Sequence, residues 1–141
     1  MSTPIIPGAE PISISEGTCG AVLLLHGYMG TVQTVRDLAV AFARAGFAVE
    51  APLLPGHGTA VEDMLPTTWA DWSAEAEAAL DRLEARVDGK VVVAGLSMGG
   101  SLTAWLGHLP ELAADPQEGR WLAEELLRLT DPPPPAAGRS D

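Results

Sequence analysis

Cysteine is almost absent from this chain, because Cys19 is the only one among 141 residues. A single cysteine excludes an intrachain disulfide and a cysteine-based metal site, and this usage is typical of a reducing compartment. We therefore expect a cytoplasmic protein. No pattern in the sequence predicts a metal ion or a cofactor.

Basic residues are also scarce, since 8 Lys and Arg face 19 Asp and Glu and the formal net charge is −11. Nucleic acid and anionic membrane surfaces repel such a chain, so neither is an expected partner. The sequence has no apolar run of about 18 residues, which a membrane-spanning helix needs. Its first 20 residues lack the basic start and apolar stretch of a signal peptide, so we expect no membrane insertion.

The clearest motif lies in residues 90–100, which read KVVVAGLSMGG. A β-branched run ends at Gly95, Ser97 follows two residues later, and Gly99 precedes a helix-compatible segment. This order predicts a strand, a sharp turn and a helix, and it matches the Gly-x-Ser-x-Gly nucleophile elbow. Larger side chains in place of the glycines beside Ser97 would collide with adjacent chain. The turn also requires Ser97 to adopt a strained backbone conformation at a helix N-terminus. An ordinary serine in a Gly-rich turn remains an alternative for this motif alone. A phosphate loop is less favoured, because no Lys-Ser/Thr pair follows the glycines.

Two further motifs follow predicted strands: residues 26–30 read HGYMG after the apolar run 21–25, and residues 54–58 read LPGHG after 47–51. The three motifs in this order resemble the α/β-hydrolase superfamily, and within it bacterial carboxylesterases and monoacylglycerol-lipase-like serine hydrolases. The resemblance covers roughly residues 10–108, the N-terminal half of that fold. It implies that Ser97 is the nucleophile and that the backbone N–H groups of Tyr28 and Met98 form the oxyanion hole, with His26 shaping the loop.

The spacing of apolar residues predicts an α/β fold with a doubly wound, mostly parallel sheet, because strands near 21, 47 and 90 alternate with helices. Thr34 and Asp37 are expected to cap the first helix. Thr67 or Thr68 is expected to begin the second. Trp69 and Trp72 are predicted to fill the core beneath that second helix rather than to bind a ligand.

Three segments are predicted along the chain. Residues 1–108 form a partial α/β-hydrolase domain, 109–131 a short helical segment, and 132–141 a disordered tail rich in proline.

The catalytic base is harder to place, because α/β-hydrolases order their triad as Ser, then acid, then His. His108 is the only histidine after Ser97, no acidic residue separates the two, and eleven helical residues would put them about 16 Å apart. His26 and His57 remain as substitute bases, with Asp63, Asp115 and Glu118 also available but unsupported. The simplest interpretation is a chain truncated or frame-shifted soon after the elbow.

Three functions are compatible with these residues. The first is a serine hydrolase of carboxylic esters, acting on short acyl esters or monoacylglycerols but catalytically incomplete because the triad Asp and His are missing. The alternative is a non-catalytic remnant that binds an acyl ligand or a partner. The third is complementation by another chain that carries the missing strands, and self-association is possible as well.

Overall fold

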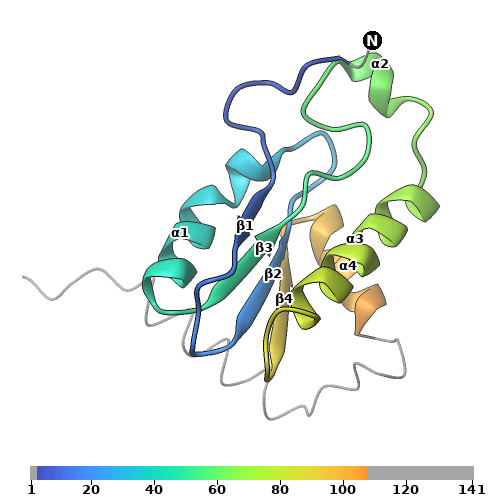
Figure 1. The fold of residues 1–141 in the computed structure, drawn as a ribbon. Coiled ribbons are helices and arrows are strands. Elements are labelled where there is room, and N and C mark those ends of the chain that lie inside the picture. The colour runs from blue at the N-terminus through green and yellow to red at the C-terminus, as the bar shows by residue number, and fades with distance from the viewer. Residues whose placement is uncertain (1–2, 108–141) are drawn as a thin grey trace, which may run out of the picture.

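The computed structural model describes residues 3–107, which contain one four-stranded sheet. Its order is β1-β3-β2-β4, in which β2 runs parallel to both of its neighbours and β1 runs antiparallel to β3 (Figure 1). The strands are β1 (Ile12–Ile14), β2 (Ala21–Leu25), β3 (Ala48–Ala51) and β4 (Val91–Gly95). The predicted α/β class and mostly parallel sheet are confirmed.

Helices cover both faces of the sheet, as a doubly wound fold requires (Figure 1). The 3-10 helix η1 (Val32–Thr34) and helix α1 (Arg36–Arg44) lie on one face. Helices α3 (Trp69–Glu84) and α4 (Met98–Leu106) lie on the other, and the short helix α2 (Val61–Met64) belongs to the connection between β3 and α3. Because β3 and β4 flank β2 on opposite sides, the strand order reverses at β2, where open α/β sheets place their ligand crevice.

Strand β2 is buried along its whole length, and its alternating side chains serve two cores. Val22 and Leu24 pack toward α1, where Phe42 is the largest buried side chain. Leu23 and Leu25 pack toward α3 and α4. A central parallel strand covered on both faces has no solvent-facing side, which explains its unbroken apolar run.

The predicted cap of the first helix is wrong. Thr34 ends η1 instead, and its hydroxyl donates to the Thr31 carbonyl at 2.8 Å. Helix α1 follows Val35 and has no side-chain cap. The Thr31 hydroxyl accepts a hydrogen bond from Gln33 N at 3.2 Å, so the polar cap serves the tight 3-10 turn that precedes the α-helix.

The placement of Trp69 in the core is also wrong, because its side chain is 40% exposed. Helix α3 begins after Thr68, as predicted, but its buried stripe begins one turn later, at Ser73, and continues through Ala76, Ala79, Leu80 and Leu83. Helical spacing puts both tryptophans on this stripe. The position of the helix over the sheet, which spacing does not determine, leaves the first turn outside the core.

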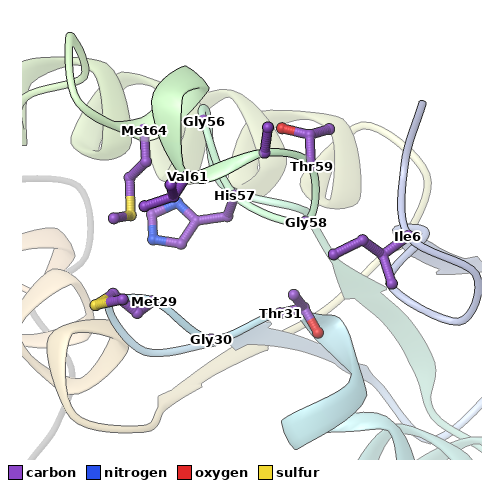
Figure 2. Close-up of a pocket in the computed structure, with 11 residues that line it drawn as sticks. Ile6, Met29, Gly30, Thr31, Gly56, His57, Gly58, Thr59, Val61 and Met64 are labelled. Atoms are coloured by element: carbon purple, nitrogen blue, oxygen red, sulfur yellow. The ribbon is translucent and has the colours of Figure 1, made fainter. Parts of the chain in front are cut away.

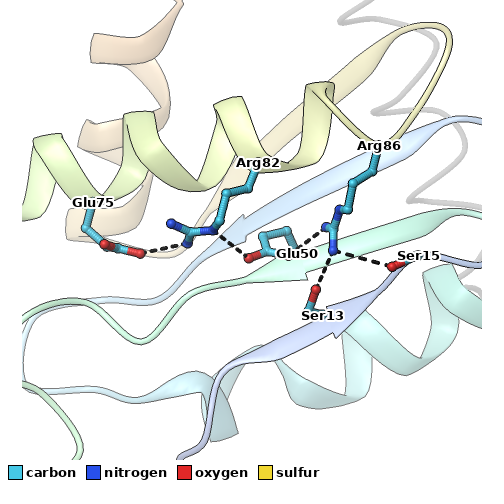
Figure 3. A network of polar contacts seen from close by, with 6 residues as sticks. All are labelled: Ser13, Ser15, Glu50, Glu75, Arg82 and Arg86. Carbon is cyan, nitrogen blue, oxygen red and sulfur yellow. Dashed lines mark hydrogen bonds and ion pairs between the residues drawn. The ribbon is translucent and has the colours of Figure 1, made fainter.

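A buried carboxylate joins α3 to the sheet (Figure 3). Glu50 on β3 is 5% exposed, and its two oxygens accept from Arg86 Nη2 at 2.7 Å and from Arg82 Nε at 3.4 Å. Arg82 also binds Glu75 at 2.8 Å, and Arg86 donates to Ser13 on β1. The network connects α3 with β3 and β1 and compensates the charge of Glu50.

Several sequence predictions lie outside the described residues: the segment 109–131, the tail 132–141, and the residues His108, Asp115 and Glu118. Within residues 3–107, no helix has the length and apolar content needed to cross a membrane.

Candidate active site

Three loops meet at the carboxyl ends of β2, β3 and β4, because parallel strands end at the same edge of a sheet. Two hydrogen bonds join them. Leu96 N, after β4, donates to the carbonyl of Leu25 on β2 at 3.0 Å. Leu54 N, after β3, donates to His26 Nε2, after β2, at 3.0 Å. The three sequence motifs therefore lie next to one another at this edge of the sheet.

Ser97 lies in the turn between β4 and α4 with φ 55° and ψ −116°, a conformation that non-glycine residues rarely adopt. A Cβ on Gly95 would lie 2.0 Å from the Gly99 carbonyl oxygen, and a Cβ on Gly99 would lie 2.1 Å from that of Leu25. Neither position can hold a larger residue without moving backbone. The predicted strain at Ser97 and the steric reason for the two glycines are confirmed.

The β2 loop passes directly against this turn. A Cβ on Gly27 would lie 3.3 Å from the Ser97 Cβ, so the two backbones approach closely. Gly30 N then donates to the Gly27 carbonyl at 3.0 Å and closes a turn in which Met29 has φ 58°. Tyr28 follows Gly27 and Met98 follows Ser97, so the two predicted oxyanion donors adjoin residues that touch. Among residues 3–107, neither of their N–H groups donates to another backbone carbonyl.

His26 is fully buried, and the backbone occupies both of its ring nitrogens. Nδ1 lies 2.9 Å from the Gly27 carbonyl oxygen, which can only accept, so this nitrogen carries the proton. Nε2 accepts from Leu54 N. Burial lowers the pKa of His26, and the nearby His57 lowers it further, against the opposing effect of the bond to Gly27. The neutral ring ties two loops together and is not free to take a proton from Ser97.

His57 is 4% exposed and is held by the carbonyl of Pro55. Its Nδ1 lies 3.0 Å from that oxygen, and Trp72 Nε1 donates to the same oxygen at 3.2 Å. The rings of Tyr28 and Trp72 pack edge-on against the imidazole, with centroid separations of 6.1 and 5.9 Å. Trp72 packs against the core, as predicted, and it also contacts Pro55 and His57.

No described histidine or carboxylate hydrogen-bonds to the Ser97 hydroxyl. Asp63 is engaged elsewhere, because hydrogen bonds from the side chains of Thr59 and Thr3 lower its pKa. Within residues 3–107, no three His, Cys, Asp or Glu side chains gather closely enough to hold a metal ion.

A cavity of about 150 Å³ lies beside His57, between the β2 loop and the segment that runs from the β3 loop into α2 (Figure 2). It is lined by Ile6, Met29, Gly30, Thr31, Gly56, His57, Gly58, Thr59, Ala60, Val61 and Met64. A second, wider pocket of about 380 Å³ opens between Thr3 and the Leu53–Gly56 stretch, and His57 lines both. The sequence predicted His57 as a loop histidine and a candidate substitute base, and its Pro-Gly-His-Gly context was the signal for a place at this edge of the sheet.

Comparison with known proteins agrees with this geometry. A model of the alpha/beta hydrolase family matches residues 22–140. The thermostable monoacylglycerol lipase of Bacillus sp. (strain H-257) is 46% identical over 110 residues, which cover 77% of this chain and 43% of the lipase. The carboxylesterase of Bacillus subtilis (strain 168) is 33% identical over 93 residues, covering 66% of this chain and 38% of that protein.

A solved structure also matches, from work on LipS and LipT, two metagenome-derived lipolytic enzymes. It superposes with a TM-score of 0.71 at 45% identity and covers 74% of this chain and 42% of that one. The chain thus spans less than half the length of each of these relatives.

Proposed function

This chain belongs to the alpha/beta hydrolase family, and we propose that it acts on carboxylic esters through Ser97. The observation that carries the proposal is the strained Ser97 backbone at the N-terminus of α4, pressed against the Gly27 loop. A hydroxyl held there is exposed, and the helix dipole favours negative charge beside it. Two relatives of this chain are named as a monoacylglycerol lipase and a carboxylesterase, so monoacylglycerols and short acyl esters are the proposed substrates.

In the proposed reaction the Ser97 oxygen attacks the ester carbonyl carbon, and the carbonyl oxygen gains negative charge. The N–H groups of Tyr28 and Met98 donate to that oxygen, the alcohol leaves, and water then releases the acyl group from Ser97. The attack requires a base that accepts the Ser97 proton. The described residues place none there, so activation of Ser97 is expected to be weak in this chain by itself.

The test is covalent labelling of Ser97 with a fluorophosphonate probe. Removing triad members from a serine protease costs about a millionfold in rate but leaves roughly a thousandfold acceleration over water. We therefore expect slow labelling of the folded chain and turnover of p-nitrophenyl butyrate barely above background. Ser97→Ala should abolish labelling, whereas Ser101→Ala, an exposed serine on the same helix, should leave it unchanged.

Three results would each contradict a part of this proposal. Labelling that survives Ser97→Ala would remove Ser97 as the nucleophile. Rapid stoichiometric labelling with ordinary turnover would show that a base acts on Ser97, contrary to the weak activation expected here. Binding of an acyl ligand with no labelling at all would favour the non-catalytic alternative.

The open edge of β4 supports a proposal about association. β4 is the last strand of the sheet, and among the described strands it pairs only with β2. Its valines are only partly buried, whereas β2 is buried throughout. Unpaired strand edges recruit further strands, so we expect either self-association or binding of a complementing chain. Light scattering should show a mass that rises with concentration, and a monodisperse monomer would contradict this.

A further inference from the structure

His57 holds an acceptor nitrogen that no residue in the described part of the chain uses. The Pro55 carbonyl can only accept, so in the neutral ring the proton is on Nδ1 and Nε2 carries the lone pair. No described group hydrogen-bonds to Nε2, although the atom is buried. A buried polar atom without a partner costs free energy comparable to a lost hydrogen bond, so such an atom marks a place where a ligand donor is favoured.

The ring is held rigidly at the wall of the cavity. Pro55 and the edge-on contacts of Tyr28 and Trp72 define its orientation, and Figure 2 shows it between Met64 and the loop that carries Met29. Met29, which also lines the cavity, is 68% exposed. Exposed side chains change rotamer readily, so Met29 can make room for a ligand beside the His57 ring without disturbing the core.

The cavity wall selects the chemistry of the donor. Ile6, Met29, Val61 and Met64 make it largely apolar, and a charged ammonium group would be costly to bury there. An anion would face a lone pair and a chain of net charge −11. A neutral hydroxyl satisfies the nitrogen without bringing in a charge.

We propose that His57 is a substrate-binding residue whose Nε2 accepts a hydrogen bond from a free hydroxyl on the alcohol portion of the ester. The proposal rests on the proposed ester substrate, since the cavity adjoins the loop that carries Tyr28 and touches Ser97. If His57 acts in this way, the chain should bind esters of diols and triols more tightly than esters of simple alcohols.

The experiment compares glycerol 1-monobutyrate with propyl butyrate, which has the same acyl group and carbon skeleton without the hydroxyls. Binding to the full chain carrying Ser97→Ala is followed by titration, and the imidazole ¹⁵N resonances of its histidines are recorded. We expect roughly tenfold tighter binding of the monobutyrate, the effect of one hydrogen bond to a buried acceptor. The Nε2 resonance of His57 should move with the monobutyrate and not with the propyl ester.

His57→Phe keeps a planar ring and removes the acceptor, so it should bind both esters alike. Thr59→Ala removes a different polar group from the same cavity and should keep the preference. The proposal is overturned if His57→Phe retains the preference, or if the Nε2 resonance reports only bound water and does not respond to either ester. If His57→Phe does not fold, the resonance measurement decides by itself.

Because every protein in this comparison lacks the Ser97 hydroxyl, its outcome is independent of the labelling test. Loss of Ser97 labelling with retained ester preference would refute the catalytic assignment alone. Labelling with no preference would refute only the role of His57.

Discussion

Two arginines, Arg86 and Arg82, share the buried carboxylate of Glu50 but hold it unequally. Arg86 approaches a Glu50 oxygen at 2.7 Å and its side chain is 28% exposed, whereas Arg82 approaches at 3.4 Å and is 49% exposed. The Glu50 side chain itself is only 7% exposed. Replacing either arginine by methionine keeps most of its apolar stem and removes the charge, so the two variants form a matched pair.

The expected costs follow from this geometry. Arg86→Met leaves one oxygen of a buried carboxylate without its short charge-assisted bond, which costs about 1.5–3 kcal/mol. The loss stays below the 3–5 kcal/mol of a fully broken buried pair, because Arg82 remains and both arginine side chains are partly exposed. Arg82→Met removes the longer contact to Glu50 and the 2.8 Å contact to Glu75, and because both involve a half-exposed side chain the loss should be about 0.5–1 kcal/mol.

Urea unfolding at constant protein concentration measures both values, provided that the slopes with denaturant agree among the variants. A double-mutant cycle of Arg86→Met with Glu50→Gln then isolates their coupling, expected to exceed about 1 kcal/mol. Equal midpoints for Arg86→Met and Arg82→Met, or a coupling near zero, would refute the argument that burial of Glu50 makes the Arg86 contact the stronger one.

Two further predictions concern the Ser97 turn and the start of α3. Gly99→Ala should cost more than about 2 kcal/mol in urea unfolding, because the new Cβ would lie 2.1 Å from the Leu25 carbonyl oxygen. Gly107→Ala, whose Cβ would have no neighbour nearer than 3.6 Å, is the control, and equal midpoints would contradict the close packing. Hydrogen bonds from the Thr68 hydroxyl and N–H hold the pKa of Asp71 below its ordinary value of 3.8. The ionised Asp71 carboxylate therefore stabilises the folded chain fully above pH 3.8, and this stabilisation is lost as the pH falls through the lowered pKa. Asp71→Asn should thus lower the free energy of unfolding at about pH 6 and have little effect on it toward about pH 2. A pH-independent difference in midpoint would count against this.

The local turn at Ser97 could be predicted because its cause is local. Gly95 and Gly99 are required by backbone atoms within a few residues or on the adjacent strand, and the strained Ser97 follows from the same turn. Burial of β2 on both faces could be predicted as well, since a run of five apolar residues cannot alternate between core and solvent. The capping threonine of α1 was misplaced because a 3-10 turn and an α-helix share similar polar starts.

The succession of strands, helices and turns along the chain, and the glycines that allow Ser97 its conformation, could therefore be predicted without the fold. These depend on periodicity and steric exclusion, which act over short stretches of chain. Three features depend on tertiary contacts instead: Glu50 meets Arg86, Trp69 remains outside the core, and Pro55 and Trp72 orient His57 so that no described residue bonds to its Nε2. Each of these depends on where α3 lies over the sheet, a position determined by the packing of Ala76, Ala79 and Leu83 against strands distant in the sequence.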